Sequence, residues 1–201
     1  MKDRNEEERD ILKEVGNIGA GNALTSLSMM LDQPLDLGMP DCQIVRRQEA
    51  GSLLDDPTHL YAGVALTMTG TIDCVLLLLM NKEFAEMVAG TLDSDEPVLD
   101  VNSLTDMQKS ALSEVGNIMG NAYITALGTI LDIRIDVSVP RIAVDEGSQV
   151  LNDFLIEHEE ASDRLLFINS GFTAKGTKLK SCILLCPTDD SLSSMISQLS
   201  F

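Results

Sequence analysis

Two long stretches of the chain, about residues 6–31 and 106–131, place an apolar residue at every third or fourth position. This spacing matches the 3.6-residue turn of an α-helix, so it predicts two long amphipathic helices. Glu14 and Asn17, three positions apart, lie on a face outside the apolar stripe, where a surface site would have to be. The stripe of the first helix consists of Ile11, Leu12, Val15, Ile18, Leu24, Leu27 and Leu31.

The predicted helices begin with residues typical of N-caps. Asn5 is followed three positions later by Glu8, and Thr105 by Gln108, which gives each helix a reciprocal capping pair. We therefore expect the two helices to start at equivalent points of the chain.

An extended segment follows each helix, at about residues 35–47 and 133–145. Pro40 and Pro140 interrupt these segments, and proline has no N–H to donate to a strand ladder. We therefore expect edge strands, or strands that are paired on one side only at the proline.

Two hairpins come next, with strands at about residues 60–69 and 71–80 in the first half and 164–173 and 178–186 in the second. Glycine-containing turns separate the strands of each hairpin, as hairpin geometry favours. The turn residues are Gly70 in the first hairpin and Ala174-Lys175-Gly176-Thr177 in the second.

Each half closes with a short amphipathic helix. The second half also has a longer, acidic, helix-compatible stretch at 149–160, where the first has only a short segment around 50–57. The order helix, strand, hairpin, helix thus occurs twice, and it predicts an α+β (layered α/β) fold with an antiparallel sheet. The residues that mark the closing helices are Phe84, Met87, Val88 and Thr91 in the first and Leu192, Met195, Ile196 and Leu199 in the second.

One motif occurs twice, one hundred residues apart: Glu14-Val15-Gly16-Asn17-Ile18 returns as Glu114-Val115-Gly116-Asn117-Ile118. Other recurring residues are Thr25, Leu27, Leu31, Asp32, Asp36 and Pro40, matched by Thr125, Leu127, Leu131, Asp132, Asp136 and Pro140. We expect a pseudo-two-fold fold made of two similar units. The expected boundaries are 1–201 for a single pseudo-symmetric domain, about 5–92 and 105–200 for its repeats, and about 93–104 for an acidic connection.

The helix interiors contain several glycines: Gly16, Gly19 and Gly21 in the first helix, and Gly116 and Gly120 in the second. Each destabilises a helix interior by roughly 0.8–1 kcal/mol relative to alanine. Either a neighbouring element packs very close to the helix, or a partner protein approaches its backbone near the asparagine. The two explanations are compatible.

The chain carries 32 acidic and 14 basic residues, for a formal net charge of −18. Such a surface repels nucleic-acid phosphates and anionic membranes. Aromatic residues make up only 3% and tryptophan is absent, which argues against stacking platforms for single-stranded nucleic acid. We attribute the charge to solubility; steering toward a basic partner is the alternative.

The expected location is the cytoplasm. The first six residues hold no apolar signal segment, and the longest apolar run, Val75 to Met80, is far short of the ~20 residues of a membrane helix. Cys182 and Cys186 would lie roughly 13 Å apart along a strand at ~3.3 Å per residue, too far to share a metal or a disulfide. With Cys42 and Cys74, they fit reduced core residues, and we expect no metal and no cofactor in this chain.

The full motif reads Asp/Ser, three residues, Glu, two residues, Asn, twenty-two residues, Pro. It closely resembles the motif of the CheC/CheX/FliY family of chemotaxis phosphatases, in its two-site CheC type, and the resemblance covers almost the whole chain. The residues that carry it are Asp10, Glu14, Asn17 and Pro40, and again Ser110, Glu114, Asn117 and Pro140.

The resemblance implies an enzyme that hydrolyses the aspartyl phosphate of a CheY-like response regulator (CheY-P), with Mg²⁺ held by the regulator. By motif position, Asn17 and Asn117 would hold the attacking water, and Glu14 and Glu114 would bind the regulator's active-site lysine. The remaining motif residues would have supporting roles. Asp10 and Ser110 would support or cap the helix locally, and Pro40 and Pro140 would shape the strand behind it.

Two alternatives accompany this reading. The first is a non-catalytic switch or adaptor protein that binds phosphorylated CheY, as related flagellar switch proteins share the fold; two intact Glu/Asn pairs and no assembly domain expected after Phe201 favour the enzyme. The second, compatible with catalysis, is an adaptor for the receptor deamidase CheD, a partner that the resemblance alone implies.

Overall fold

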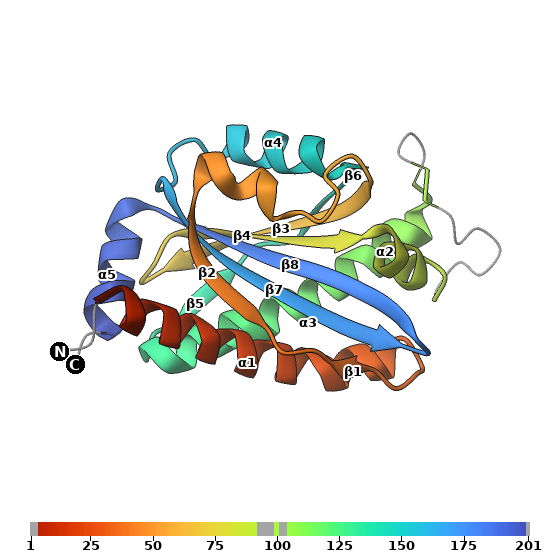
Figure 1. Cartoon of the computed structure of the whole chain (residues 1–201), viewed down its shortest axis with the longest axis horizontal. Coiled ribbons are helices and arrows are strands. Elements are labelled where there is room, and N and C mark those ends of the chain that lie inside the picture. Colours follow the sequence, from red (N-terminus) through yellow and green to blue (C-terminus); the bar gives the residue numbers. More distant parts are fainter. Residues whose placement is uncertain (1–3, 92–98, 101–103, 200–201) are drawn as a thin grey trace.

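The computed structural model describes residues 4–91, 99–100 and 104–199, and for 4–12, 198 and 199 it describes the backbone alone (Figure 1). Most of the predicted connection at 93–104 therefore lies outside the described residues. The helices are α1 (Arg4–Met30), the 3₁₀-helix η1 (Arg47–Leu53), α2 (Lys82–Ala89), α3 (Asp106–Leu131), α4 (Gly147–Glu157) and α5 (Asp189–Leu199). The strands are β1 (Asp36–Leu37), β2 (Asp41–Arg46), β3 (Leu60–Gly70), β4 (Cys74–Asn81), β5 (Ile135–Val137), β6 (Arg141–Glu146), β7 (Arg164–Ala174) and β8 (Thr177–Pro187).

The eight described strands form one antiparallel sheet, in the order β1-β7-β8-β4-β3-β5, with β2 also paired to β7 and β6 to β3. The strands that follow each long helix therefore pair with the hairpin of the other half. Asp41 of β2 lies opposite Asn169, and Arg141 of β6 lies opposite Ala65. The two halves thus exchange their outer strands, while β4 and β8 pair at the centre. The predicted α+β class and duplicated unit are confirmed.

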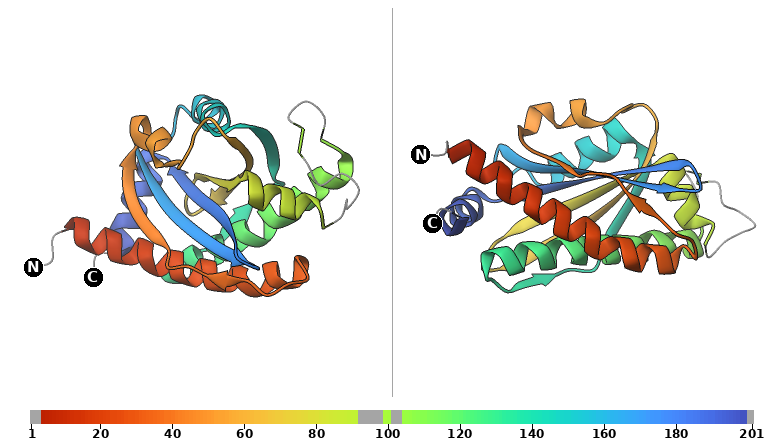
Figure 2. Two further views of the ribbon diagram at one scale, coloured as in Figure 1. Left: turned by 45° about the vertical axis from the view of Figure 1, so that its right-hand side comes forward. Right: turned by 60° about the horizontal axis from the view of Figure 1, so that its bottom comes forward.

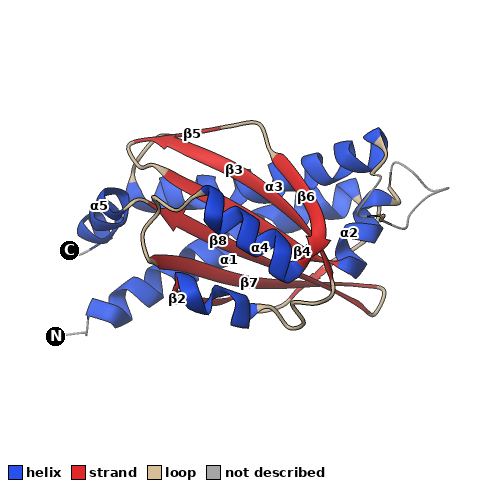
Figure 3. Cartoon of the chain, turned by 90° about the horizontal axis from the view of Figure 1, so that it is seen from above, coloured by secondary structure: helices blue, strands red, loops and turns tan. Residues whose placement is uncertain are grey.

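Helices cover both faces of the sheet (Figures 1 and 3). The long helices α1 and α3 lie against one face together with α2 and α5, and η1 and α4 lie against the other. No helix in the described part of the chain is long and apolar enough to cross a membrane.

The central strand β4 explains the longest apolar run of the sequence. Leu76, Leu78 and Met80 belong to the core beneath α1 and α3, whereas Leu77 and Leu79 belong to the core beneath η1 and α4. Successive side chains of a strand point to opposite faces. Because both faces are covered, Leu76 to Met80 are all buried, and Val75 at the start of the run is partly buried.

The extended segments after the long helices are each broken in two, as their prolines predicted. Pro40 lies between β1 and β2, and Pro140 between β5 and β6, and these strands form the two edges of the sheet. Both breaks remain hydrogen-bonded to the neighbouring strand of the sheet. The Gly38 amide donates to the Gly171 carbonyl at 2.8 Å, and the Ser138 amide donates to the Thr67 carbonyl at 2.9 Å. The expectation of edge strands is confirmed.

The helix starts agree with the sequence in one half. The Thr105 hydroxyl accepts from the Gln108 amide at 3.1 Å, and the Gln108 side chain accepts from the Thr105 amide at 3.1 Å, so this capping pair is confirmed. Helix α1, by contrast, begins at Arg4, which places Asn5 inside the helix rather than at its cap. The side chains of Asn5 and Glu8 lie outside the described residues.

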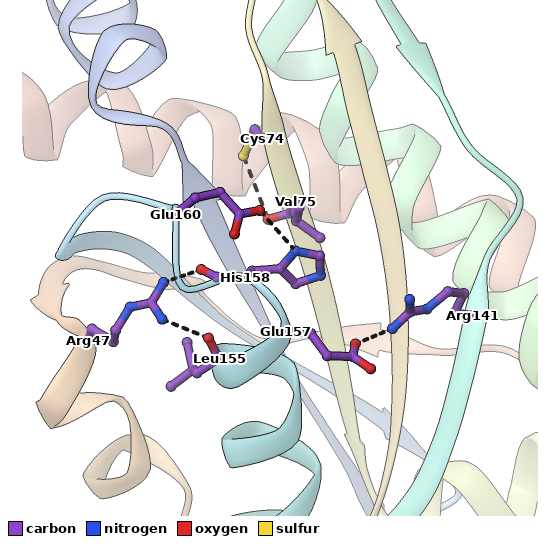
Figure 4. Close-up of polar contacts among 8 residues, drawn as sticks. All are labelled: Arg47, Cys74, Val75, Arg141, Leu155, Glu157, His158 and Glu160. Atoms are coloured by element: carbon purple, nitrogen blue, oxygen red, sulfur yellow. Dashed lines mark hydrogen bonds and ion pairs between the residues drawn. The ribbon is translucent and has the colours of Figure 1, made fainter.

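A helix that the sequence pattern did not predict, η1, occupies the place that α4 occupies in the other half. Arg47, its first residue, joins the two (Figure 4). Its guanidinium donates to the carbonyl of Leu155 at 2.7 Å and to that of His158, at the C-terminal end of α4. Carbonyls at this end of a helix have no intrahelical partner, so Arg47 supplies the capping donors.

Candidate functional site

The first Glu/Asn pair lies near the middle of α1. Glu14 and Asn17 are both exposed, whereas Val15 and Gly16 between them are buried. Residues three apart are neighbours on a helix surface. The buried side of α1 thus fixes the backbone, and the opposite side presents a carboxylate next to an amide. We call this surface the Glu/Asn face.

The second pair has the same placement on α3. Glu114 is exposed, Asn117 is half-buried, and Val115 is buried against the core. Ser110, one turn before Glu114, is exposed as well. Its counterpart Asp10 lies on α1, but the side chain falls outside the described residues.

Close packing at Gly16, on the buried side of α1, brings the motif proline against this helix. A Cβ atom on Gly16 would lie 2.7 Å from the Sγ of Cys42 and 3.4 Å from the Cβ of Pro40. Real Cβ atoms do not approach sulfur that closely, so only glycine lets α1 lie this near to the β1–β2 break. Pro40 therefore packs against α1 at the turn that carries Glu14 and Asn17.

The glycines of α3 have the same kind of role. A Cβ atom on Gly116 would collide with Val64, and one on Gly120 with Leu66, both on β3. Helix α3 also packs against β5 and β6, which flank the half-buried Pro140. Strand contact thus explains Gly116 and Gly120 of the second helix.

The two long helices run antiparallel and side by side (Figure 2), and Gly19 lies at their contact. A Cβ atom there would lie 2.5 Å from the ring of Tyr123. The Tyr123 hydroxyl shares a buried hydrogen bond of 2.5 Å with Ser170 on β7. Burial raises the pKa of Tyr123 to about 12, although this hydrogen bond lowers it. A neutral tyrosine therefore links α1, α3 and the sheet.

Gly21 behaves differently from these glycines. It is exposed, and a Cβ atom would meet nothing within 4 Å. At seven positions after Glu14 and four after Asn17, Gly21 extends the Glu/Asn face. The equivalent position of α3 holds Asn121, which is exposed. The same helical spacing could have pointed to both positions in the sequence, and they make the two faces unequal.

The Glu/Asn faces consist of exposed or half-buried side chains on the surfaces of two helices. A cavity of about 350 Å³ lies elsewhere, lined by Asp55, His59, Tyr61, Lys82 and Lys180 among others, and contains no motif residue. Small-molecule sites are concave and largely enclosed. An exposed carboxylate and amide on a rigid helix instead suit contact with another macromolecule.

Within the described residues, no group of three or more His, Cys, Asp or Glu side chains is arranged to hold a metal ion. The predicted independence from a cofactor stays a prediction. The chemistry that the Glu/Asn faces can supply is hydrogen bonding by an amide, which does not titrate, and ion pairing by a carboxylate.

Comparison with known proteins adds a family to this geometry. Residues 7–41 and 107–144, which contain the two motif copies, match the model of the CheC-like family. The chain is 27% identical over 190 residues to the CheY-P phosphatase CheC of Bacillus subtilis, an alignment that covers 92% of this chain and 90% of that protein.

Solved structures share the fold. The crystal structure of Thermotoga maritima FliY superposes with a TM-score of 0.72 at 20% identity, covering 100% of this chain and 98% of that one. The FliM middle domain from H. pylori superposes with a TM-score of 0.65 at 13% identity, covering 98% of this chain and 99% of that one. At these identities the likeness concerns the fold alone.

Proposed function

We propose that this chain, whose two motif regions match the model of the CheC-like family, hydrolyses the aspartyl phosphate of a CheY-like response regulator at two sites, one on α1 and one on α3. One observation carries this proposal: each long helix presents an exposed glutamate three residues before an accessible asparagine, on a backbone fixed by buried neighbours. The name of the B. subtilis relative supports the same reaction.

An aspartyl phosphate needs little covalent help to hydrolyse. The oxygen of a water attacks the phosphorus, the bond from phosphorus to the aspartyl oxygen breaks, and the products are a free carboxylate and inorganic phosphate. The catalyst must hold the water in line with the breaking bond. Asn17 and Asn117 would do this through their side-chain amides, which can both donate to and accept from a water.

Glu14 and Glu114 would set the docking register. Each carboxylate lies one helical turn from its asparagine, so a lysine of the regulator bound to the glutamate would fix where the phosphorus lies relative to the water. Mg²⁺ would remain with the regulator. The remaining motif residues would support the helix: Asp10 and Ser110 locally, and Pro40 and Pro140 through the adjoining strands.

A non-catalytic role is the second candidate. The FliM middle domain has this fold, which supports an adaptor or switch protein that binds the phosphorylated regulator without hydrolysing it. Binding of a CheD-type deamidase is compatible with either role and rests on the family resemblance alone. Two complete Glu/Asn pairs favour catalysis over binding only.

The first test follows the decay of a phosphorylated CheY-type regulator with this protein and its variants. Asn17→Ala and Asn117→Ala should each abolish turnover at one site and keep it at the other. In the double variant kcat should fall by about 10²-fold or more, the loss typical of removing one positioned hydrogen-bonding group. Because Asn17 is exposed and Asn117 only half-buried, and alanine is the better helix former, the thermal unfolding midpoint of the double variant should not fall.

Matched controls separate the site from the helix surface. Asn22→Ala changes an exposed asparagine on another face of α1, and Asn152→Ala one on α4, so both should retain full activity. Glu14→Ala with Glu114→Ala should raise KM more than it lowers kcat. Tight binding of the phosphorylated regulator without faster decay would instead establish the adaptor role, and lost cooperativity of unfolding in the double variant would remove the site assignment.

A further inference from the structure

Two large apolar side chains stand out in the described part of the chain because they are almost fully exposed at equivalent positions. Met39 is 96% exposed and Val139 is 84% exposed, and each directly precedes a motif proline. Single exposed apolar residues are common and need no explanation. The same exposure at the same motif position in both halves is different, since neither side chain contributes to the core.

The backbone holds both residues in place. Met39 follows Gly38, whose amide donates to Gly171 at 2.8 Å, and Val139 follows Ser138, whose amide donates to Thr67 at 2.9 Å. Each lies in the break between two short edge strands. The side chains therefore project from ordered backbone.

Met39 also adjoins the contact between the β1–β2 break and α1. Pro40 packs against Gly16, with 3.4 Å between its Cβ and the Cβ position of Gly16. Met39 and Asn17 each lie one residue from this contact, and consecutive Cα atoms are about 3.8 Å apart. An exposed apolar side chain thus adjoins the contact between the β1–β2 break and the turn of α1 that carries Asn17. Val139 has the equivalent place in the motif of the second half, between β5 and β6, both of which pack against α3.

We propose that Met39 and Val139 are positioning residues that anchor the phosphorylated response regulator, each supplying the apolar contact beside its polar Glu/Asn face. This inference rests on the proposed function, because the occupant is the regulator whose phosphoryl group must reach Asn17 or Asn117. A carboxylate and an amide alone would form a hydrated contact with the regulator that contributes little binding free energy. A neighbouring apolar anchor that becomes buried on docking adds affinity and fixes the angle of approach.

The test replaces the anchors with polar residues of similar shape in single-site backgrounds. Met39→Gln is examined with Asn117→Ala, and Val139→Thr with Asn17→Ala. Burial of such a side chain contributes a large share of the binding free energy of a small interface. We therefore expect KM for the phosphorylated regulator to rise about tenfold for Met39→Gln and less for Val139→Thr, with kcat unchanged. Met39→Leu keeps an apolar side chain and should have the same KM as the protein with Met39, which a purely structural role would not predict.

The controls are Met29→Gln and Ile156→Thr, which change side chains that are 71% and 70% exposed, at the end of α1 and on α4. Neither should alter KM. Binding to a regulator held phosphorylated by beryllofluoride is measured in parallel, so that docking is seen without turnover.

The outcomes separate the anchors from the proposed function. Unchanged KM and Kd in an active enzyme would overturn the anchors and leave the phosphatase intact. The two anchor variants could instead bind the beryllofluoride-bound regulator more weakly while the wild-type protein does not speed hydrolysis. This result would support the anchor role of Met39 and Val139 and overturn the proposed phosphatase activity. A wild-type protein that does not bind the phosphorylated regulator would overturn both.

Discussion

At Gly21 the folded protein offers no reason for a glycine, since a methyl group there would meet no atom within 4 Å. Gly16 and Gly19 are different, because strand β2 and the ring of Tyr123 occupy the space that a side chain would need. Of the two explanations open from the sequence, close packing accounts for those two residues. Approach of a partner to the helix backbone stays a prediction, and Gly21 is where it applies.

Two alanine substitutions separate these roles. Gly21→Ala should raise the free energy of unfolding by about 0.8–1 kcal/mol, because alanine is the better helix former and the space is open. Gly16→Ala should lower it by about 1–3 kcal/mol, because the new methyl collides with Cys42. Urea unfolding measures both. If a partner approaches at Gly21, the same substitution should raise KM in an Asn117→Ala background; an unchanged KM would contradict that approach.

At the scale of elements, η1 and α4 form the layer opposite the long helices, and Arg47 connects them. Its side chain donates to the carbonyls of Leu155 and His158, while its amide donates to the Asp163 carbonyl at 2.9 Å. Beyond these contacts, Arg141 on β6 pairs with Glu157 at the exposed edge of α4 (Figure 4). The exposed pair contributes little to stability, whereas the half-buried hydrogen bonds of Arg47 contribute more.

We therefore predict that Arg47→Met lowers the free energy of unfolding by about 1–3 kcal/mol, since two carbonyls at the end of α4 lose their donor while the apolar stem is kept. Phosphatase activity should not change, because this layer and the Glu/Asn faces lie on opposite sides of the sheet. Arg46→Met, at the exposed neighbouring position, is the control and should be neutral. Equal loss in both variants would show that Arg47 acts through charge alone.

Across the whole molecule, two apolar cores bury all the cysteines. Burial is the main cause that raises the pKa of Cys42 to about 11, and those of Cys182 and Cys186 to about 12; it also raises that of Cys74 well above its ordinary value. Each thiol therefore stays protonated in the folded state at a pH where it ionises in the unfolded chain. The expectation of reduced core cysteines agrees with this burial.

These pKa shifts predict the pH dependence of stability. A group whose folded pKa is raised stabilises the fold fully below its unfolded pKa, here near 9, and that stability is lost as the pH rises toward the folded pKa. Under reducing conditions the urea midpoint should therefore hold up to about pH 9 and fall between pH 9 and pH 11. Native protein at pH 8 should react slowly with a thiol reagent; rapid reaction of all four cysteines would contradict the burial.

The sequence by itself determined the features that depend on neighbouring residues. Helical periodicity placed Glu14 and Asn17 side by side, Thr105 with Gln108 set the start of α3, and the turn containing Gly176 set the second hairpin. In the first hairpin the predicted turn at Gly70 was wrong by a few residues: Gly70 ends β3, and residues 71–73 form the turn. These follow from local geometry, in which three or four positions along the chain fix which side chains are adjacent.

Only the tertiary structure decided which distant segments meet. The alternation of a strand shows that it has a buried face, but not which strand it pairs with, so the exchange of β2 and β6 between the halves was not predictable. For the same reason the sequence could not show that Pro40 packs against Gly16, or that Tyr123 fills the space left by Gly19. Such contacts are selected by the packing of the whole chain, because each one becomes favourable only when the others have formed.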